Sequence, residues 1–143
     1  MGQQQLLLVI LVTIIVGIAT VVAINTFGSA ADSANVDAVR QDLASMAASA
    51  QGYYMKPGAM GGGGNTFDGI TFNDISFGGE VIDGQNATNE NGDYSIPASI
   101  TGANFVVTAT PASDSTQTIQ ALVCADDMVM GNLGGTSITT TCP

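Results

Sequence analysis

Cationic and imidazole side chains are almost absent from this sequence. The 143 residues include no His and no Trp, and Arg40 and Lys56 are the only cations against 12 acidic residues. The net charge of −10 argues against nucleic acid as a partner, because binding phosphates needs a cationic surface. The same deficit leaves any nucleophile without an identifiable base, so we expect that the protein is not an enzyme.

Charge of either sign is missing from residues 6–24, which read LLLVILVTIIVGIATVVAI. A helix of this length can cross a bilayer, whose hydrocarbon core needs about 20 apolar residues. The competing interpretation is a cleaved secretory signal, with Gly28, Ser29 and Ala30 as the small residues of a cleavage site. Such a signal has a basic start and an apolar core of about 7–15 residues, whereas residues 1–5 carry no charged side chain. We therefore expect the segment to stay on the mature protein.

Helical periodicity continues beyond the apolar run. The apolar positions follow steps of three and four residues: Val36, Val39, Leu43, Met46, Ala50. This spacing is typical of an amphipathic helix with one buried stripe, and Pro57 with Gly58 ends it. The sequence thus predicts one helix over residues 1–56, of which residues 1–25 are an apolar segment for a membrane or a filament core.

The remaining residues, 57–143, read as a globular β head. Residues 104–110 and 118–124 are rich in β-branched side chains and are separated by a polar turn, which predicts a hairpin. Weaker strand candidates are residues 69–72, 76–82, 94–96, 128–130 and 137–141. The expected fold class is α+β, with a small antiparallel sheet packed on the amphipathic half of the helix.

The loop at residues 83–93 (DGQNATNENGD) is too polar to belong to the core. Its side-chain oxygens make it a candidate calcium site, and it is the only cofactor site that the sequence offers. The spacing does not match an EF-hand, which favours a plain solvated loop. The loop also contains Asn86-Ala87-Thr88, so Asn86 is a candidate glycosylation site.

Cys124 and Cys142 are the only cysteines. An even count in a chain whose anchor implies export favours a disulfide, with two buried cytosolic thiols as the alternative. A zinc site is disfavoured, because two Cys without His do not make a zinc ligand set.

The start MGQQQLLLVIL, the apolar helix, its amphipathic extension, the β head and the cysteine pair together resemble a mature type IV pilin. The resemblance implies that Met1 is an N-terminus exposed by a prepilin peptidase and then N-methylated. In an alternative register Gly2 would be the last leader residue and Gln3 the mature start. That register fits worse, because it puts Leu7 where most pilins carry Glu.

The resemblance also implies which residues pack between subunits in a filament: Gln5, Leu6, Leu7, Val9, Ile10, Ile14 and Gly17. Gln5 departs from the family pattern, since most pilins carry Glu there to pair with the N-terminal amine of a neighbour. An amide accepts a hydrogen bond but supplies no countercharge, so we expect a weaker pairing. If the helix loosens, Gly17 is the best candidate, because Gly costs about 1 kcal/mol in a helix interior.

For a type IV pilin, the expected function is that of a structural subunit in an extracellular filament serving adhesion, motility or surface attachment. The expected partners are identical subunits, the inner membrane before assembly, and the pilus assembly machinery with its prepilin peptidase. Two alternatives remain open. One is a pseudopilin of a type II secretion system, and the other is a single-span anchored surface binding protein that never polymerises.

Overall fold

The computed structural model describes residues 2–135 and 138–143. Its elements are helix α1 (Gly2–Met55), a short 3-10 helix η1 (Gly58–Met60) and six strands. The strands are β1 (Glu80–Val81), β2 (Asn86–Thr88), β3 (Gly92–Ser95), β4 (Asn104–Pro111), β5 (Ile119–Cys124) and β6 (Met128–Met130). The α+β fold class predicted from the sequence is confirmed.

The chain divides into two compact units, Met1–Ala34 and Asn35–Pro143, and the division falls within α1. The first unit is the apolar part of the helix. The second unit, called the head below, contains the rest of α1 and the whole sheet. The amphipathic half of the helix therefore belongs to the same compact unit as the strands against which it packs.

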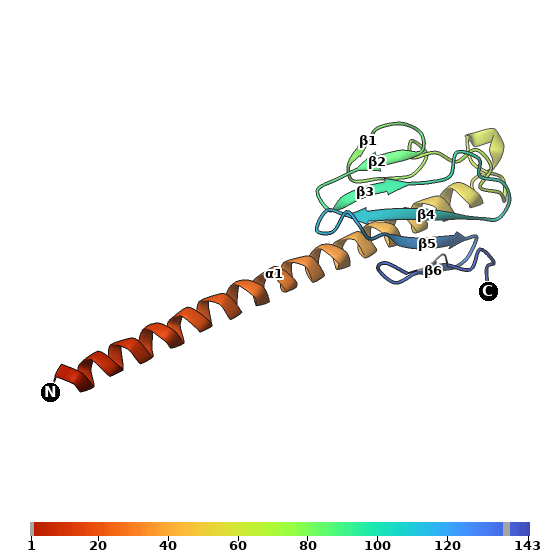
Figure 1. The fold of residues 1–143 in the computed structure, drawn as a ribbon. Coiled ribbons are helices and arrows are strands. Elements are labelled where there is room, and N and C mark those ends of the chain that lie inside the picture. The colour runs from red at the N-terminus through yellow and green to blue at the C-terminus, as the bar shows by residue number, and fades with distance from the viewer. Residues whose placement is uncertain (1, 136–137) are drawn as a thin grey trace. The chain divides into compact units, whose positions relative to one another are not determined.

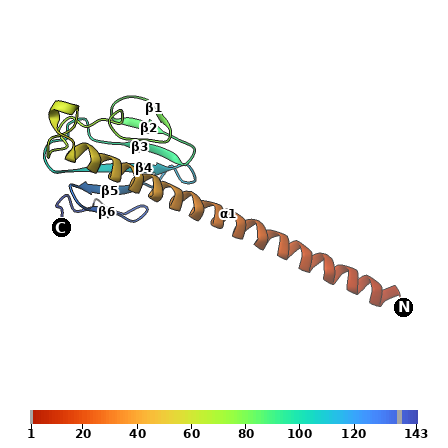
Figure 2. The ribbon, with the colours of Figure 1, turned by 180° about the vertical axis from the view of Figure 1, so that it is seen from behind.

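The six strands form one antiparallel sheet in which sequence neighbours are also spatial neighbours, in the order β1-β2-β3-β4-β5-β6 (Figure 1). The predicted hairpin is the longest pairing, with Asn104 of β4 opposite Cys124 of β5 and Ala109 opposite Ile119. Within the head, α1 lies across one face of this sheet (Figure 2).

The core of the head forms between that helix face and the sheet. The buried residues of α1 are Val39, Leu43, Met46, Ala47 and Ala50. They confirm the predicted stripe from Val39 to Ala50, whereas Val36 at its start is only partly buried. Residues of β4 alternate between buried and partly buried, as expected of a strand that presents one face to a core. Phe105, Val107 and Ala109 thereby face α1 together with Ile119, Ala121 and Val123 of β5.

Several of the weaker strand predictions are wrong. Residues 69–72 form no strand, although Ile70 and Phe72 are buried in the core, and only Glu80–Val81 is a strand within residues 76–82. Residues 138–141 are not a strand, and Ser137 lies outside the described residues. The predictions for β3 and β6 hold, with β3 displaced toward Gly92.

The polar segment 83–93 is more ordered than predicted. It contains β2 and its turn into β3, and Ala87 at the centre of β2 is buried in the core. The prediction that this loop lies outside the core was wrong. A single small apolar residue can be buried in the core here, because its backbone pairs with a strand on each side. Ala87 pairs with Val81 of β1 and with Tyr94 of β3.

The other face of the sheet is covered in part by the C-terminal segment. Leu122 is fully buried but does not belong to the core beneath α1, as the strand alternation of β5 requires. Across this face, the Ile138 backbone N–H donates to Gln120 Oε1 at 3.3 Å, and Asn104 Nδ2 donates to the Thr140 carbonyl at 3.2 Å.

Candidate functional site

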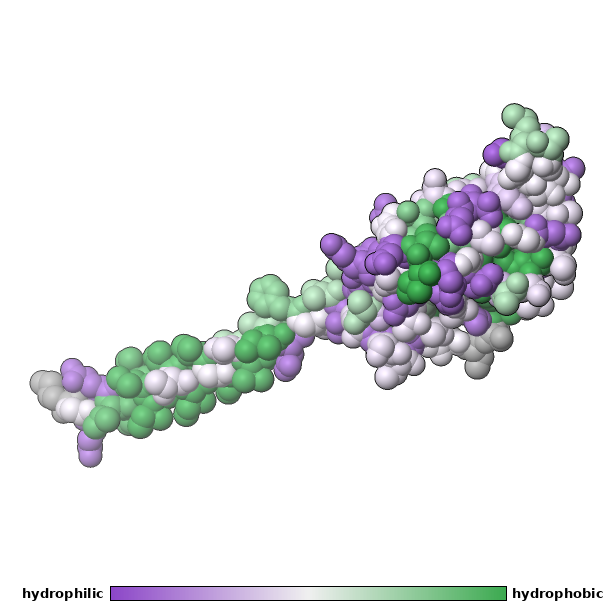
Figure 3. All heavy atoms as spheres, turned by 90° about the horizontal axis from the view of Figure 1, so that it is seen from above, coloured by the Kyte–Doolittle hydropathy of each residue, from purple (hydrophilic) through white to green (hydrophobic). Residues whose placement is uncertain are grey.

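The first compact unit presents an apolar surface without any cover. Every Leu, Ile and Val between Leu6 and Ile24 is exposed, with exposed fractions from 48% at Val12 to 67% at Leu7. Between a hydrophilic start and the head, the surface of this helix is mostly hydrophobic, whereas the head shows mixed polarity (Figure 3). Full burial of one such side chain is worth about 1.5–3 kcal/mol, so this surface favours lipid or protein surroundings over water.

The threonine hydroxyl groups of this unit are bonded within the helix. Thr13 Oγ1 donates to the Ile10 carbonyl at 2.8 Å, Thr20 Oγ1 to the Val16 carbonyl at 2.8 Å, and Thr26 Oγ1 to the Val22 carbonyl at 2.9 Å. An unpaired polar group in hydrocarbon is costly, and these bonds remove that cost. These bonds were not predicted from the sequence, although the spacing of each Thr three or four residues after an apolar residue is compatible with them.

The predicted assembly residues all lie on this exposed helix. Leu6, Ile10, Ile14 and Gly17 follow steps of four, four and three, so they share one side, and Leu7 and Val9 flank them. Gly17 lies within α1, which is continuous at this position, and an added Cβ would meet nothing within 4 Å of it. Gln5 is exposed in the first turns, and Met1 lies outside the described residues.

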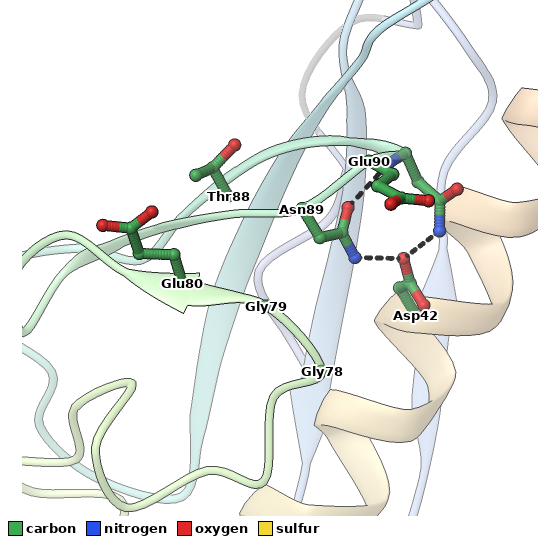
Figure 4. A pocket seen from close by; sticks show the side chains of 8 residues that line it. Asp42, Gly78, Gly79, Glu80, Thr88, Asn89 and Glu90 are labelled. Carbon is green, nitrogen blue, oxygen red and sulfur yellow. Dashed lines mark hydrogen bonds between the residues drawn. The ribbon is translucent and has the colours of Figure 1, made fainter.

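A second polar cluster lies in the head, where the turn between β2 and β3 meets α1 (Figure 4). One carboxylate oxygen, Asp42 Oδ2, accepts three hydrogen bonds. They come from Asn89 Nδ2 at 2.8 Å, Asn91 Nδ2 at 2.7 Å and the Tyr94 hydroxyl at 2.7 Å. A single helix carboxylate thus fixes the turn and strand β3 to α1.

The environment of Asp42 shifts two ionisation equilibria. Burial opposes the charged form of Asp42, but the hydrogen bonds from Asn91, Tyr94 and Asn89 together outweigh it, and the pKa of this carboxyl lies below its usual value. Burial of Tyr94, reinforced by the same carboxylate, raises the pKa of its hydroxyl well above the usual range. The cluster is therefore anionic on Asp42 and neutral on Tyr94 near neutral pH.

The residues of the candidate calcium loop are engaged with other protein groups. Asp83 Oδ1 accepts the backbone N–H groups of Gln85 and Asn86, both at 2.8 Å, and Asn89 Oδ1 accepts the N–H of Asn91 at 2.9 Å. The structure thus separates Asp83, which caps the start of β2, from Asn89 and Asn91, which bind Asp42. Among the described residues, no group of three or more His, Cys, Asp or Glu side chains is arranged to hold a metal ion.

Asn86 is exposed on β2, where an external group could reach it. Its side-chain amide donates to both carboxylate oxygens of Asp83 at 3.1 Å. Glycosylation at Asn86 stays a prediction, and it would require this contact to open.

The two cysteines form the predicted disulfide. Cys124 at the end of β5 is bonded to Cys142, with Cα atoms 5.9 Å apart. The bond joins the sheet to the C-terminal segment, which contacts Gln120 and Asn104. Its structural effect is thus to keep this segment on the sheet face opposite α1.

Known proteins offer no direct assignment. No family model matches the chain, and neither a curated protein nor a solved structure matches it. The structural evidence for a function consists of one N-terminal helix that is long and apolar enough to cross a membrane, and of a disulfide-bonded α+β head.

Proposed function

We propose that the protein is the structural subunit of an extracellular type IV pilus filament, held in the inner membrane before assembly. The single observation that carries the proposal is the exposed apolar helix surface of residues 6–24. A surface of this extent requires lipid or identical neighbours, and a filament core supplies the neighbours. Sequence resemblance to mature pilins supports the choice of a filament over a permanent anchor.

The head suits the outside of such a filament. All acidic residues except Asp32 belong to the head, and an exposed anionic surface keeps a polymer soluble. The disulfide fits an oxidising compartment outside the cytoplasm. Under the proposal, the head works mechanically and as a surface for attachment.

The decisive experiment examines material sheared from cells of the native host. Negative-stain microscopy should show thin filaments, and mass spectrometry should identify this chain as their main component. Recovery of the chain only as detergent-soluble monomers would favour the anchored binding protein. Filaments that form only on overexpression would favour the pseudopilin.

A matched pair of substitutions tests whether the apolar surface drives assembly. Ile14→Asp places a charge in the helix surface, and Ile82→Asp places the same charge at an exposed Ile of the head, with exposed fractions of 54% and 63%. Ile14→Asp should abolish filaments. The variant should still enter the membrane, because one Asp at a helix centre costs about 2.5–3.5 kcal/mol against many apolar neighbours. Normal filaments from Ile14→Asp would overturn the proposal.

The chemistry of the N-terminus provides an independent test. Mass analysis of the native protein should find Met1 as an N-methylated first residue, as prepilin processing implies. A product that starts at Ala31 would show that the apolar segment is a discarded signal, and the proposed filament core would not exist.

A further inference from the structure

The turn between β2 and β3 contains the only Asn in the sequence that is followed by Gly, Asn91 with Gly92. An Asn before Gly is prone to spontaneous deamidation, because Gly adds no side chain to hinder attack by its backbone nitrogen. We propose that Asn91 is a latent deamidation site of the head and that Asp42 holds it unreacted in the folded protein.

The fold needs both residue types at these positions. Asn91 is needed as a donor, since its Nδ2 lies 2.7 Å from Asp42 Oδ2. Gly92 is needed because it pairs with Pro111, and an added Cβ would lie 2.2 Å from the Thr110 carbonyl oxygen. The reactive pair therefore results from two separate packing requirements.

Deamidation would proceed through a cyclic imide. The backbone nitrogen of Gly92 gives up its proton to a base and attacks Cγ of Asn91. A bond from this nitrogen to Cγ forms, the bond from Cγ to Nδ2 breaks, and Nδ2 takes up the proton from the base and leaves as ammonia. Water then opens the ring at either carbonyl and yields Asp or isoaspartate, with no oxidation or reduction.

The folded structure opposes each movement that this reaction requires. Ring closure must turn the Asn91 side chain away from Asp42 and free the Gly92 nitrogen, whose N–H donates to Asn89 Oδ1 at 3.2 Å. The Asn91 carbonyl is also held, because it accepts hydrogen bonds from Asn35 Nδ2 and from the Ala112 backbone N–H, both at 2.9 Å. Asp42 supplies the charged partner among these contacts.

The reaction product would be incompatible with the same contacts. Conversion to Asp replaces the donor at position 91 with a carboxylate beside the carboxylate of Asp42. Like charges at this distance repel each other, so the turn would separate from α1. Deamidation thus has a structural consequence as well as a chemical one.

The test follows Asn91 by peptide mapping and mass spectrometry in the full chain, kept in detergent at mildly alkaline pH. The folded protein should convert at least about tenfold more slowly than the same protein in urea, because a hydrogen bond to a charged group must first break. Asp42→Ala should raise the folded-state rate by about tenfold for the same reason. Equal rates in the folded and denatured wild-type protein would overturn the proposal.

Two control variants distinguish the effect of the hydrogen bond between Asp42 and Asn91 on the rate from the effect of a lower overall stability. Asp37→Ala removes another carboxylate of α1, one that lies 3.6 Å from Arg40 and makes no described hydrogen bond to the turn, so the rate should stay at the wild-type value. Tyr94→Phe removes a different hydrogen bond to Asp42 and leaves the contact with Asn91 in place. If Tyr94→Phe accelerated conversion as much as Asp42→Ala, overall opening would set the rate, and the role assigned to Asp42 would be wrong.

Discussion

The two parts of α1 use their polar side chains in different ways. In the first unit, Thr13, Thr20 and Thr26 bond to carbonyls of their own helix. In the head, polar side chains of the same helix reach segments far away in the sequence: Asn35, Asp42, Ser49 and Gln51. One helix thus has a part that leaves its whole outer surface free and a part that organises a domain.

The largest expected difference between the two parts concerns apolar truncation. Leu43→Ala should lower the free energy of unfolding of the head by about 2–5 kcal/mol, because Leu43 is fully buried. Leu8→Ala, on the exposed part of the same helix, should change it by less than about 0.5 kcal/mol. Urea unfolding in detergent, followed by circular dichroism, measures both, and similar losses would show that the first unit contributes to the fold of the head.

The next effect concerns the covalent link in the head. Replacing both cysteines, Cys124→Ser with Cys142→Ser, should cost about 3 kcal/mol of stability in the chain-entropy model for a loop of this size. The change should also release the C-terminal segment from its contacts with Gln120 and Asn104. Urea midpoints of the variant and the oxidised wild type test this, and equal midpoints would mean that noncovalent contacts alone hold the segment.

Loss of the Asp42 carboxylate should have a smaller effect with a distinctive pH dependence. Asp42→Ala should destabilise the head by about 1–3 kcal/mol near neutral pH, because three donors lose their acceptor. The folded-state pKa of Asp42 is lowered, so its contribution is complete above the unfolded-state pKa of about 3.9 and is lost as the pH falls through the folded-state value.

Unfolding curves measured between neutral pH and pH values below about 3.9 check this assignment. The difference between the wild type and Asp42→Ala should shrink as the pH falls. A difference that stays constant would mean that the ionised carboxylate is not what stabilises the turn.

The smallest effect contrasts two hydroxyl groups of α1. Ser49 Oγ accepts the Ser76 backbone N–H at 2.8 Å, so Ser49→Ala should cost about 0.5–1.5 kcal/mol. Thr20→Val removes a bond made only within the helix and should stay within about 0.5 kcal/mol. Thermal unfolding measures the loss of stability in both variants. An equal loss for Thr20→Val and Ser49→Ala would contradict the prediction.

The features of the fold that the sequence predicted correctly are those with a regular pattern. Exposed and buried parts of α1 differ in hydrophobic periodicity, and the hairpin of β4 and β5 consists of long runs of β-branched residues. Strand β2 was missed because its three residues, Asn86, Ala87 and Thr88, include a single apolar side chain. Its strand conformation depends on pairing with neighbours on both sides, which no local pattern contains.

The role of Asp42 could not be predicted for a related reason. Asn89 and Asn91 are turn residues that usually face water, and they lie 47 and 49 positions from Asp42. Only the pairing of β3 with β4 brings them to the helix. The disulfide was predictable, since it required only the count of cysteines and the compartment implied by the apolar segment.

The threonine bonds of the first unit have a consequence for how the helix changes surroundings. Because these hydroxyls already have partners at Ile10, Val16 and Val22, they neither gain nor lose a hydrogen bond when lipid is exchanged for neighbouring helices. Such an exchange would be nearly isoenergetic for these groups, so the threonine hydroxyls would not set its direction. In the proposed filament, the helix would therefore leave the membrane without rebuilding the hydrogen bonds of its threonines.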